Sequence, residues 1–163
     1  MKVLRMLLLA AVVGGPLLAL AAGFGLFSRD RGTEDLGSPA VAKALAERAA
    51  AMIREEGLEK ALAEISDPQS DLLQGSLYVF VVGVDGTVLA HPYDPRMIGR
   101  SILGARDFNG VAYGRELVMT ARTDRLGWVD YVDVDPVSRK QRRKSTYVLR
   151  EGDQFVACGY YLK

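Results

Sequence analysis

The residues that could carry chemistry are few, and their counts exclude several kinds of site. The chain of 163 residues contains one histidine, His91, and one cysteine, Cys158. A single Cys excludes an intrachain disulfide and any Cys-rich zinc or iron–sulfur site, and a single His excludes sites that need two imidazoles. No acid, base and nucleophile stand together in a catalytic pattern. The sequence therefore predicts no enzyme activity, no metal site and no cofactor.

Cys158 lies within an apolar and aromatic run over residues 155–160. No basic residue stands beside it in the sequence to lower the pKa of its thiol. We therefore expect Cys158 to be a small buried hydrophobic residue in a strand, rather than a reactive thiol.

The one dense cluster of charge is basic and spans residues 139–144. Its last member, Lys144, enters a predicted strand, whereas the others are expected in a solvated hairpin loop. Those loop residues are Arg139, Lys140, Arg142 and Arg143. The whole chain has 21 basic and 20 acidic residues, for a net charge of +1. This balance gives no electrostatic argument for a nucleic-acid partner.

Several aromatic side chains and the histidine are candidates for a binding pocket. His91 precedes Pro92 where a strand runs into a loop, and either a structural hydrogen bond or a place in the pocket would explain it. Trp128 and Tyr131 are three residues apart on a predicted strand, so they point to opposite faces. Core packing is the alternative role for both, as it is for Tyr78 on an earlier strand.

The elements that must position these residues follow from the periodicity of the chain. A long helix is predicted from Ser38-Pro39 to Ser66, with a break at Gly57. A helix is also predicted over residues 113–122, after loops over 92–110. The predicted strands cover residues 77–82, 87–90, 128–134, 144–150 and 154–162. Tight turns, such as the Asp85-Gly86 hairpin, make neighbouring strands antiparallel. The fold class is therefore α+β, with the long helix on one face of the sheet and a loop and helix layer over a pocket on the other.

The N-terminus is unlike the rest of the chain. Lys2 and Arg5 precede an apolar run over residues 6–27 that contains no charge. Residues 1–27 are predicted to be a secretory signal peptide or, alternatively, an uncleaved membrane anchor, and residues 28–37 a polar linker. Both alternatives predict a periplasmic or extracytoplasmic protein, secreted or anchored by this segment.

Residues 38–163 resemble the type-2 single Cache domain, an extracytoplasmic relative of the PAS fold. The resemblance is carried by residues 77–80, 85–92, 98–99, 127–131, 136, 144–148 and 159–162 in this order. It implies a five-stranded PAS-like sheet with a ligand pocket. It also implies that matching aromatic residues line this pocket and that the matching lysine lies beside it. The candidate ligand-binding residues are Tyr78, His91, Trp128, Tyr131, Lys144 and Tyr147. Tyr147 is three residues after Lys144, so a regular strand turns it to the other face.

The resemblance implies a sensor-type module that binds a small molecule. A lysine ammonium beside the pocket could hold a small carboxylate, so we expect a small organic acid as ligand. Domains of this family usually serve as the input of a chemoreceptor or histidine kinase, whereas the chain is expected to act without an output domain of its own. A membrane receptor or kinase is then the expected partner. The alternative is a structural or interaction subunit of an exported assembly, with its pocket filled by side chains.

The basic start and the uncharged run predict that the mature protein is found outside the cytoplasm. N-terminal sequencing of the exported protein distinguishes cleavage after Ala21 or Ala22 from retention of the segment. Recovery of full-length protein from the cytosol alone would contradict the prediction.

Overall fold

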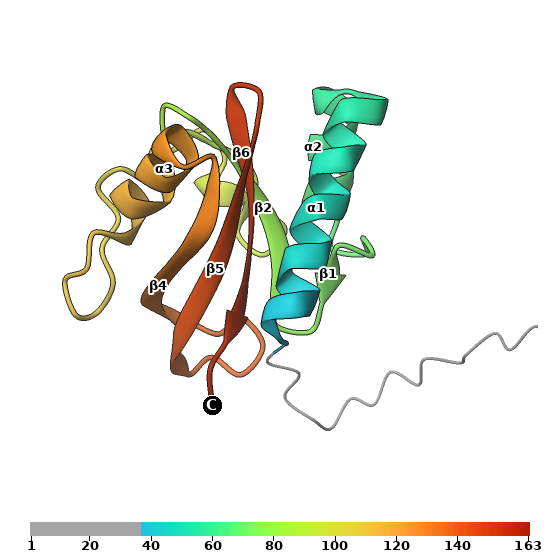
Figure 1. Ribbon diagram of the computed structural model, residues 1–163. Coiled ribbons are helices and arrows are strands. Elements are labelled where there is room, and N and C mark those ends of the chain that lie inside the picture. Colours follow the sequence, from blue (N-terminus) through green and yellow to red (C-terminus); the bar gives the residue numbers. More distant parts are fainter. Residues whose placement is uncertain (1–36) are drawn as a thin grey trace, which may run out of the picture. The chain divides into compact units, whose positions relative to one another are not determined.

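A computed structural model describes residues 37–163 (Figure 1). The expected signal peptide or anchor over 1–27, and the linker up to residue 36, lie outside the described residues. None of the helices within residues 37–163 has the length and hydropathy of a membrane-spanning segment. The helical elements are α1 (Pro39–Glu56), α2 (Leu58–Ser66), the 3-10 turn η1 (Pro95–Met97) and α3 (Tyr113–Thr123). The strands are β1 (Leu73–Gln74), β2 (Leu77–Gly83), β3 (Val88–Ala90), β4 (Leu126–Val134), β5 (Gln141–Glu151) and β6 (Gln154–Tyr161).

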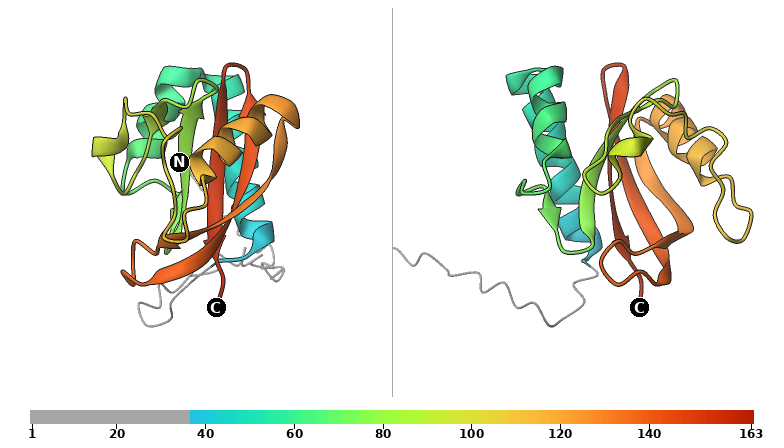
Figure 2. Two further views of the ribbon diagram at one scale, coloured as in Figure 1. Left: turned by 90° about the vertical axis from the view of Figure 1, so that its left-hand side faces the viewer. Right: turned by 180° about the vertical axis from the view of Figure 1, so that it is seen from behind.

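The strands form one antiparallel sheet with helices on both faces. The strand order is β1-β2-β6-β5-β4, and β3 pairs with the other part of β2. The views in Figures 1 and 2 place α1 and α2 on one side of the sheet and α3 with the long loops on the other. The predicted α+β fold and its five main strands are confirmed. The two-residue strand β1 is an addition, because a strand this short leaves no periodicity in the sequence.

The predicted long helix is present and is divided at Gly57. Ser38 caps α1 by accepting a hydrogen bond from the backbone N–H of Val41, and Pro39 occupies the first turn. At Gly57 the backbone has φ +88°, a left-handed conformation that glycine adopts without steric cost. The chain therefore leaves α1 and turns directly into α2.

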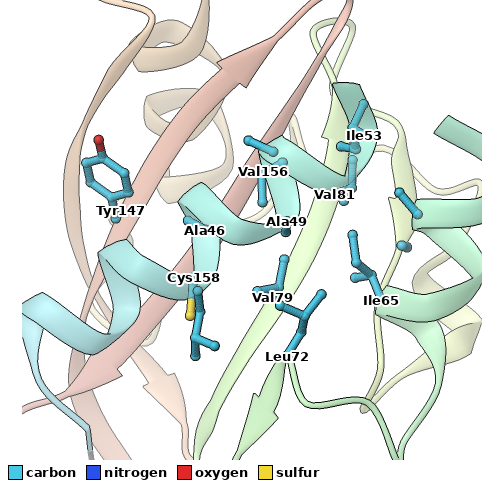
Figure 3. Packing of buried hydrophobic residues seen from close by; sticks show 14 of the residues in the cluster. Ala46, Ala49, Ile53, Ile65, Leu72, Val79, Val81, Tyr147, Val156 and Cys158 are labelled. Carbon is cyan, nitrogen blue, oxygen red and sulfur yellow. The ribbon is translucent and has the colours of Figure 1, made fainter. Parts of the chain in front are cut away.

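Small residues on α1 allow this helix to lie close to the sheet. Ala46 and Ala49 are fully buried and belong to a core formed with β2 and β6. Figure 3 shows both alanines and Ile53 beside Val79 and Val156 of these strands. Aliphatic and alanine packing of this kind stabilises the face through apolar burial and leaves no polar group to satisfy.

The opposite face of the sheet has a second core under α3 and the preceding loops. Phe80 and Phe155 of the sheet pack there with Leu117 and Val118 of α3. Gly114 sets the distance, since a Cβ atom at this position would lie 1.8 Å from the carbonyl oxygen of Ile102. The loop and helix layer predicted from the sequence is therefore confirmed as a packed cover over this face.

The prediction of a solvated loop for Arg142 and Arg143 is wrong. Both residues belong to β5, where they pair with Asp133 and Val132 of β4. The Arg142 guanidinium lies 3.8 Å from the carboxylate of Asp135, which is fully buried. The run of charge predicted a solvent-exposed loop. Pairing with β4 and the buried carboxylate of Asp135 instead extend β5 by three residues ahead of the predicted start at Lys144.

Cys158 is fully buried in β6 and belongs to the core beneath α1, as predicted (Figure 3). Burial raises the pKa of its thiol to about 12, so the thiol stays protonated at neutral pH. It packs as a small hydrophobic residue.

Candidate functional site

The candidate site is a buried lysine on the face of the sheet that α3 covers. The side chain of Lys144, on β5, is 1% exposed. Its Nζ donates hydrogen bonds to the hydroxyl of Tyr78 at 2.8 Å and to Oδ2 of Asp133 at 3.0 Å. Tyr161 adds a hydroxyl 3.3 Å from the same Asp133 oxygen. Together with Tyr131, these residues are called the Lys144 cluster.

Strand register brings the cluster together. Lys144 lies directly opposite Tyr131 of β4 on one side and Tyr161 of β6 on the other. Residues directly opposite in an antiparallel pair project to the same face, so the three side chains form a row across three strands. Asp133 is two residues beyond Tyr131 and therefore points to the same side.

Gly159 on β6 gives the Lys144 side chain its path. A Cβ atom at residue 159 would lie 2.5 Å from Cε of Lys144 and equally close to Oγ1 of Thr146. Without that atom, the lysine stem passes over β6 and reaches Tyr78 on β2. Thr146 in turn donates a hydrogen bond of 3.0 Å to the hydroxyl of Tyr131.

Aromatic rings surround the ammonium of Lys144. Its Nζ lies 4.3 Å from the ring centre of Tyr78, 5.1 Å from Tyr161 and 5.8 Å from Tyr131. Phe80 is at 6.0 Å, at the limit of a cation–π contact. These rings exclude water and direct their negative faces at the positive charge.

The charge state of the cluster follows from these contacts. Burial on its own lowers the pKa of Lys144, but the oxygens of Tyr131, Tyr78 and Asp133 offset that effect and hold it well above the ordinary value. Burial also raises the pKa of Tyr78 and Tyr161, and raises that of Tyr131 to about 12. At neutral pH the site therefore holds an ammonium ion among neutral hydroxyl groups.

His91 lies at the edge of this cluster. Its ring centre is 5.1 Å from that of Tyr78 and 6.0 Å from that of Phe80. Its Nδ1 accepts a hydrogen bond of 2.9 Å from the backbone N–H of Asp94, which places the proton of the neutral ring on Nε2. Among residues 37–163, none accepts a hydrogen bond from that Nε2. Burial, and next the charge of Lys144, lower the pKa of His91 to about 4, so the ring is neutral at pH 7.

Of the six residues predicted from the sequence, four come together and two do not. Tyr78, His91, Tyr131 and Lys144 share the face beneath the loop layer, whereas Tyr147 packs in the core beneath α1 (Figure 3). The ring of Trp128, which is 41% exposed, lies 5.1 Å from that of Tyr147 and 5.7 Å from that of Tyr160. Trp128 and Tyr147 therefore lie on the other side of the sheet from Lys144.

Sequence reasoning missed Asp133, Tyr161 and Gly159. The spacing of Asp133 from Tyr131 places both on one face, but this signal has meaning only once Tyr131 is assigned to the site. Tyr161 and Gly159 depend on the register between β5 and β6, which the sequence alone does not give.

Two surface hollows lie away from Lys144. One, of about 560 Å³, is lined by α3 and β4, with Met119 and Trp128 among its residues. The other, of about 530 Å³, is lined by α1, α2 and Asp67, with Met52 and Lys60 in its wall. Both are open surface depressions on the flanks of the domain, outside the row of residues around Lys144.

Comparison with protein families decides the class of the domain. The family described as single Cache domain 2 matches residues 40–163. The chain belongs to the single Cache domain 2 family. This is a family of extracytoplasmic sensor domains rather than of enzymes, and the predicted resemblance is confirmed. A comparison with curated proteins finds no match.

Solved structures of two chemotaxis proteins and of a Cache chemosensory domain share the fold. The periplasmic sensor domain of a chemotaxis protein is 27% identical, with a TM-score of 0.61, over 76% of this chain and 90% of that one. A methyl-accepting chemotaxis protein from Vibrio parahaemolyticus RIMD 2210633 is 19% identical, with a TM-score of 0.62, over 74% and 85%. A Cache chemosensory domain studied for its carboxylic acid recognition is 21% identical, with a TM-score of 0.60, over 76% and 88%.

The lowered pKa of His91 is directly measurable, because the chain has no other histidine. In NMR spectra of protein without a histidine tag, we expect no titration of the imidazole between pH 5 and 8. His91 binds a proton near pH 6.5 in the unfolded chain but only near pH 4 in the folded chain. The free energy of unfolding therefore falls as the pH is lowered from about 6.5 to about 4. This loss is at most about 3.5 kcal/mol, since the pKa falls from 6.5 to about 4 and one pKa unit corresponds to about 1.4 kcal/mol.

His91→Asn is the matched control, because the Asn side-chain oxygen can accept the Asp94 hydrogen bond without titrating. Urea unfolding at pH 7 and pH 4.5 should show a smaller loss of stability in this variant than in the wild type. A midpoint near 6.5 for His91 in the folded protein would contradict the burial argument.

Proposed function

We propose that this Cache domain binds a small carboxylate, with Lys144 as the anchor. The observation that carries the proposal is the buried ammonium of Lys144 beneath the loop layer, hydrogen-bonded to the hydroxyl of Tyr78 and flanked by the rings of Tyr131 and Tyr161. A carboxylate is the natural complement of an ammonium and neutral hydroxyl donors. One Cache domain of the same fold recognises carboxylic acids, which is a precedent for this chemistry.

The surroundings of Lys144 would strengthen a hydrogen bond to a carboxylate. Aromatic rings lower the local dielectric constant, and a charge-assisted hydrogen bond is stronger there than in water. The Nε2–H of the neutral His91 ring is a further donor at the edge of the cluster. Ligand recognition by this set would therefore combine one positive charge with several neutral donors.

We propose that the domain acts outside the cytoplasm, secreted or anchored, and passes its ligand state to a partner such as a membrane receptor or kinase. The similarity to a periplasmic sensor domain of a chemotaxis protein supports this role. Lys144 and Tyr161 lie on β5 and β6, and α1 packs against the other face of both strands. A shift of these strands on binding would therefore reach α1, the element that follows the N-terminal segment.

The second candidate is a structural or interaction subunit of an exported assembly that binds no ligand. The observation in its favour is that Lys144 already has a carboxylate partner within the chain, Asp133 at 3.0 Å.

A screen of small organic acids by thermal shift separates the two functions. A ligand at about 100 times its dissociation constant adds about 2.7 kcal/mol to stability.

Replacement of Lys144 tests the proposed anchor. We expect Lys144→Met, which keeps the aliphatic stem, to weaken carboxylate binding by about tenfold to a hundredfold, since a hydrogen bond to a charged group contributes about 1.5–3 kcal/mol. Isothermal titration calorimetry with the best acid from the screen measures the change.

Arg143→Met is the matched control, because Arg143 is the exposed neighbour of Lys144 and points to the other face of β5. This variant should bind as the wild type does. Equal losses in both variants, or none in Lys144→Met, would show that the anchor lies elsewhere.

A further inference from the structure

We infer that Asp133 occupies the anion-binding position of Lys144, and that a carboxylate ligand binds by displacing it. The inference rests on the proposed function, because it says how the same site is regulated. Asp133 is then an internal competitor that sets the affinity of the domain for its ligand.

The hydrogen bonds of Asp133 are those that a bound carboxylate would make. Its Oδ2 accepts from Nζ of Lys144 at 3.0 Å and from the hydroxyl of Tyr161 at 3.3 Å. Its Oδ1 accepts from the backbone N–H of Val134 at 2.8 Å. An ammonium, a tyrosine hydroxyl and a backbone amide are together suitable donors for one carboxylate group.

The exposure of the two partners differs, and this difference determines which of them can move. The Lys144 side chain is 1% exposed, whereas that of Asp133 is 32% exposed. Lys144 is held between β4 and β6 and among aromatic rings, but Asp133 lies near the end of β4, the last strand of the sheet. A rotation of its side chain would return the carboxylate to water, where its hydration offsets the lost contacts.

Displacement also accounts for the charge balance of the site. With Asp133 in place, the ammonium is neutralised within the chain, so an added carboxylate would be a second buried negative charge. Exchange of one carboxylate for another keeps the buried pair neutral, and an unpaired buried charge is avoided in both arrangements. The apparent affinity for the ligand is reduced by the fraction of molecules in which Asp133 holds the position.

Chemical rescue tests this assignment without knowledge of the natural ligand. Asp133→Ala removes the internal carboxylate and leaves Lys144 in place. We expect sodium acetate to raise the melting temperature of Asp133→Ala relative to sodium chloride of equal ionic strength, with acetate binding about tenfold to a hundredfold tighter than in the wild type. Asp133→Asn, which keeps the size of the side chain, provides the same comparison by calorimetry if the alanine variant does not fold.

Two controls make the result specific. Asp130→Ala removes the same charge from the other face of β4, where the side chain is exposed, and should respond to acetate as the wild type does. Adding Lys144→Met to Asp133→Ala should abolish the rescue. A response to acetate that is equal in wild type and Asp133 variants would overturn the inference.

The experiment separates this inference from the proposed function. A wild-type protein that binds an organic acid through Lys144, while acetate does not stabilise the Asp133 variants, retains the function and overturns the inference. A wild-type protein that binds no acid, while acetate rescues Asp133→Ala, upholds Asp133 as the occupant of the position and overturns the proposed function.

Discussion

The ammonium of Lys144 is buried on the face of the sheet that α3 covers, and the arrangement of the residues around it follows from this one charge. Removing an ammonium from water costs several kcal/mol, so a charge in this position requires close partners. Tyr78 and Asp133 supply hydrogen bonds, and the rings of Tyr131 and Tyr161 supply cation–π contacts on either side. The strand register, the path over Gly159 and the loop layer that covers the cluster all serve to hold this one charge.

The two faces of the sheet differ in chemistry, although the same strands form both. Beneath α1, alanine and aliphatic residues pack closely, and this core fixes the position of the helix on β5 and β6. Beneath α3, the same strands carry Lys144, Thr146 and Tyr161, whose polar atoms find partners in Tyr78, Tyr131 and Asp133. Side chains alternate along β5, so Lys144 lies on one face and Tyr147 on the other. Only the thickness of this strand separates Lys144 from the core on which α1 packs.

Local signals made the helices and strands predictable, whereas the residues that were missed depend on the register between strands. Ser38, Gly57 and the Asp85-Gly86 turn act within a few residues, and the helix bounds and the first hairpin followed from them. Spacing showed that only one of Trp128 and Tyr131 faces the site, but the choice of Tyr131 required the position of α1. Asp133 and Tyr161 escaped because the register of the β4–β5 and β5–β6 hairpins places them beside Lys144. The error at Arg142 has the same origin.

The central claim is that Lys144 is the anchor for a carboxylate ligand. A crystal structure of residues 28–163 with the tightest-binding small carboxylate tests it most directly. We expect carboxylate oxygens within hydrogen-bond distance of Nζ of Lys144 and the hydroxyl of Tyr161, with the Asp133 side chain turned toward solvent. A ligand in the hollow between α3 and β4, with the bond between Lys144 and Asp133 intact, would contradict it.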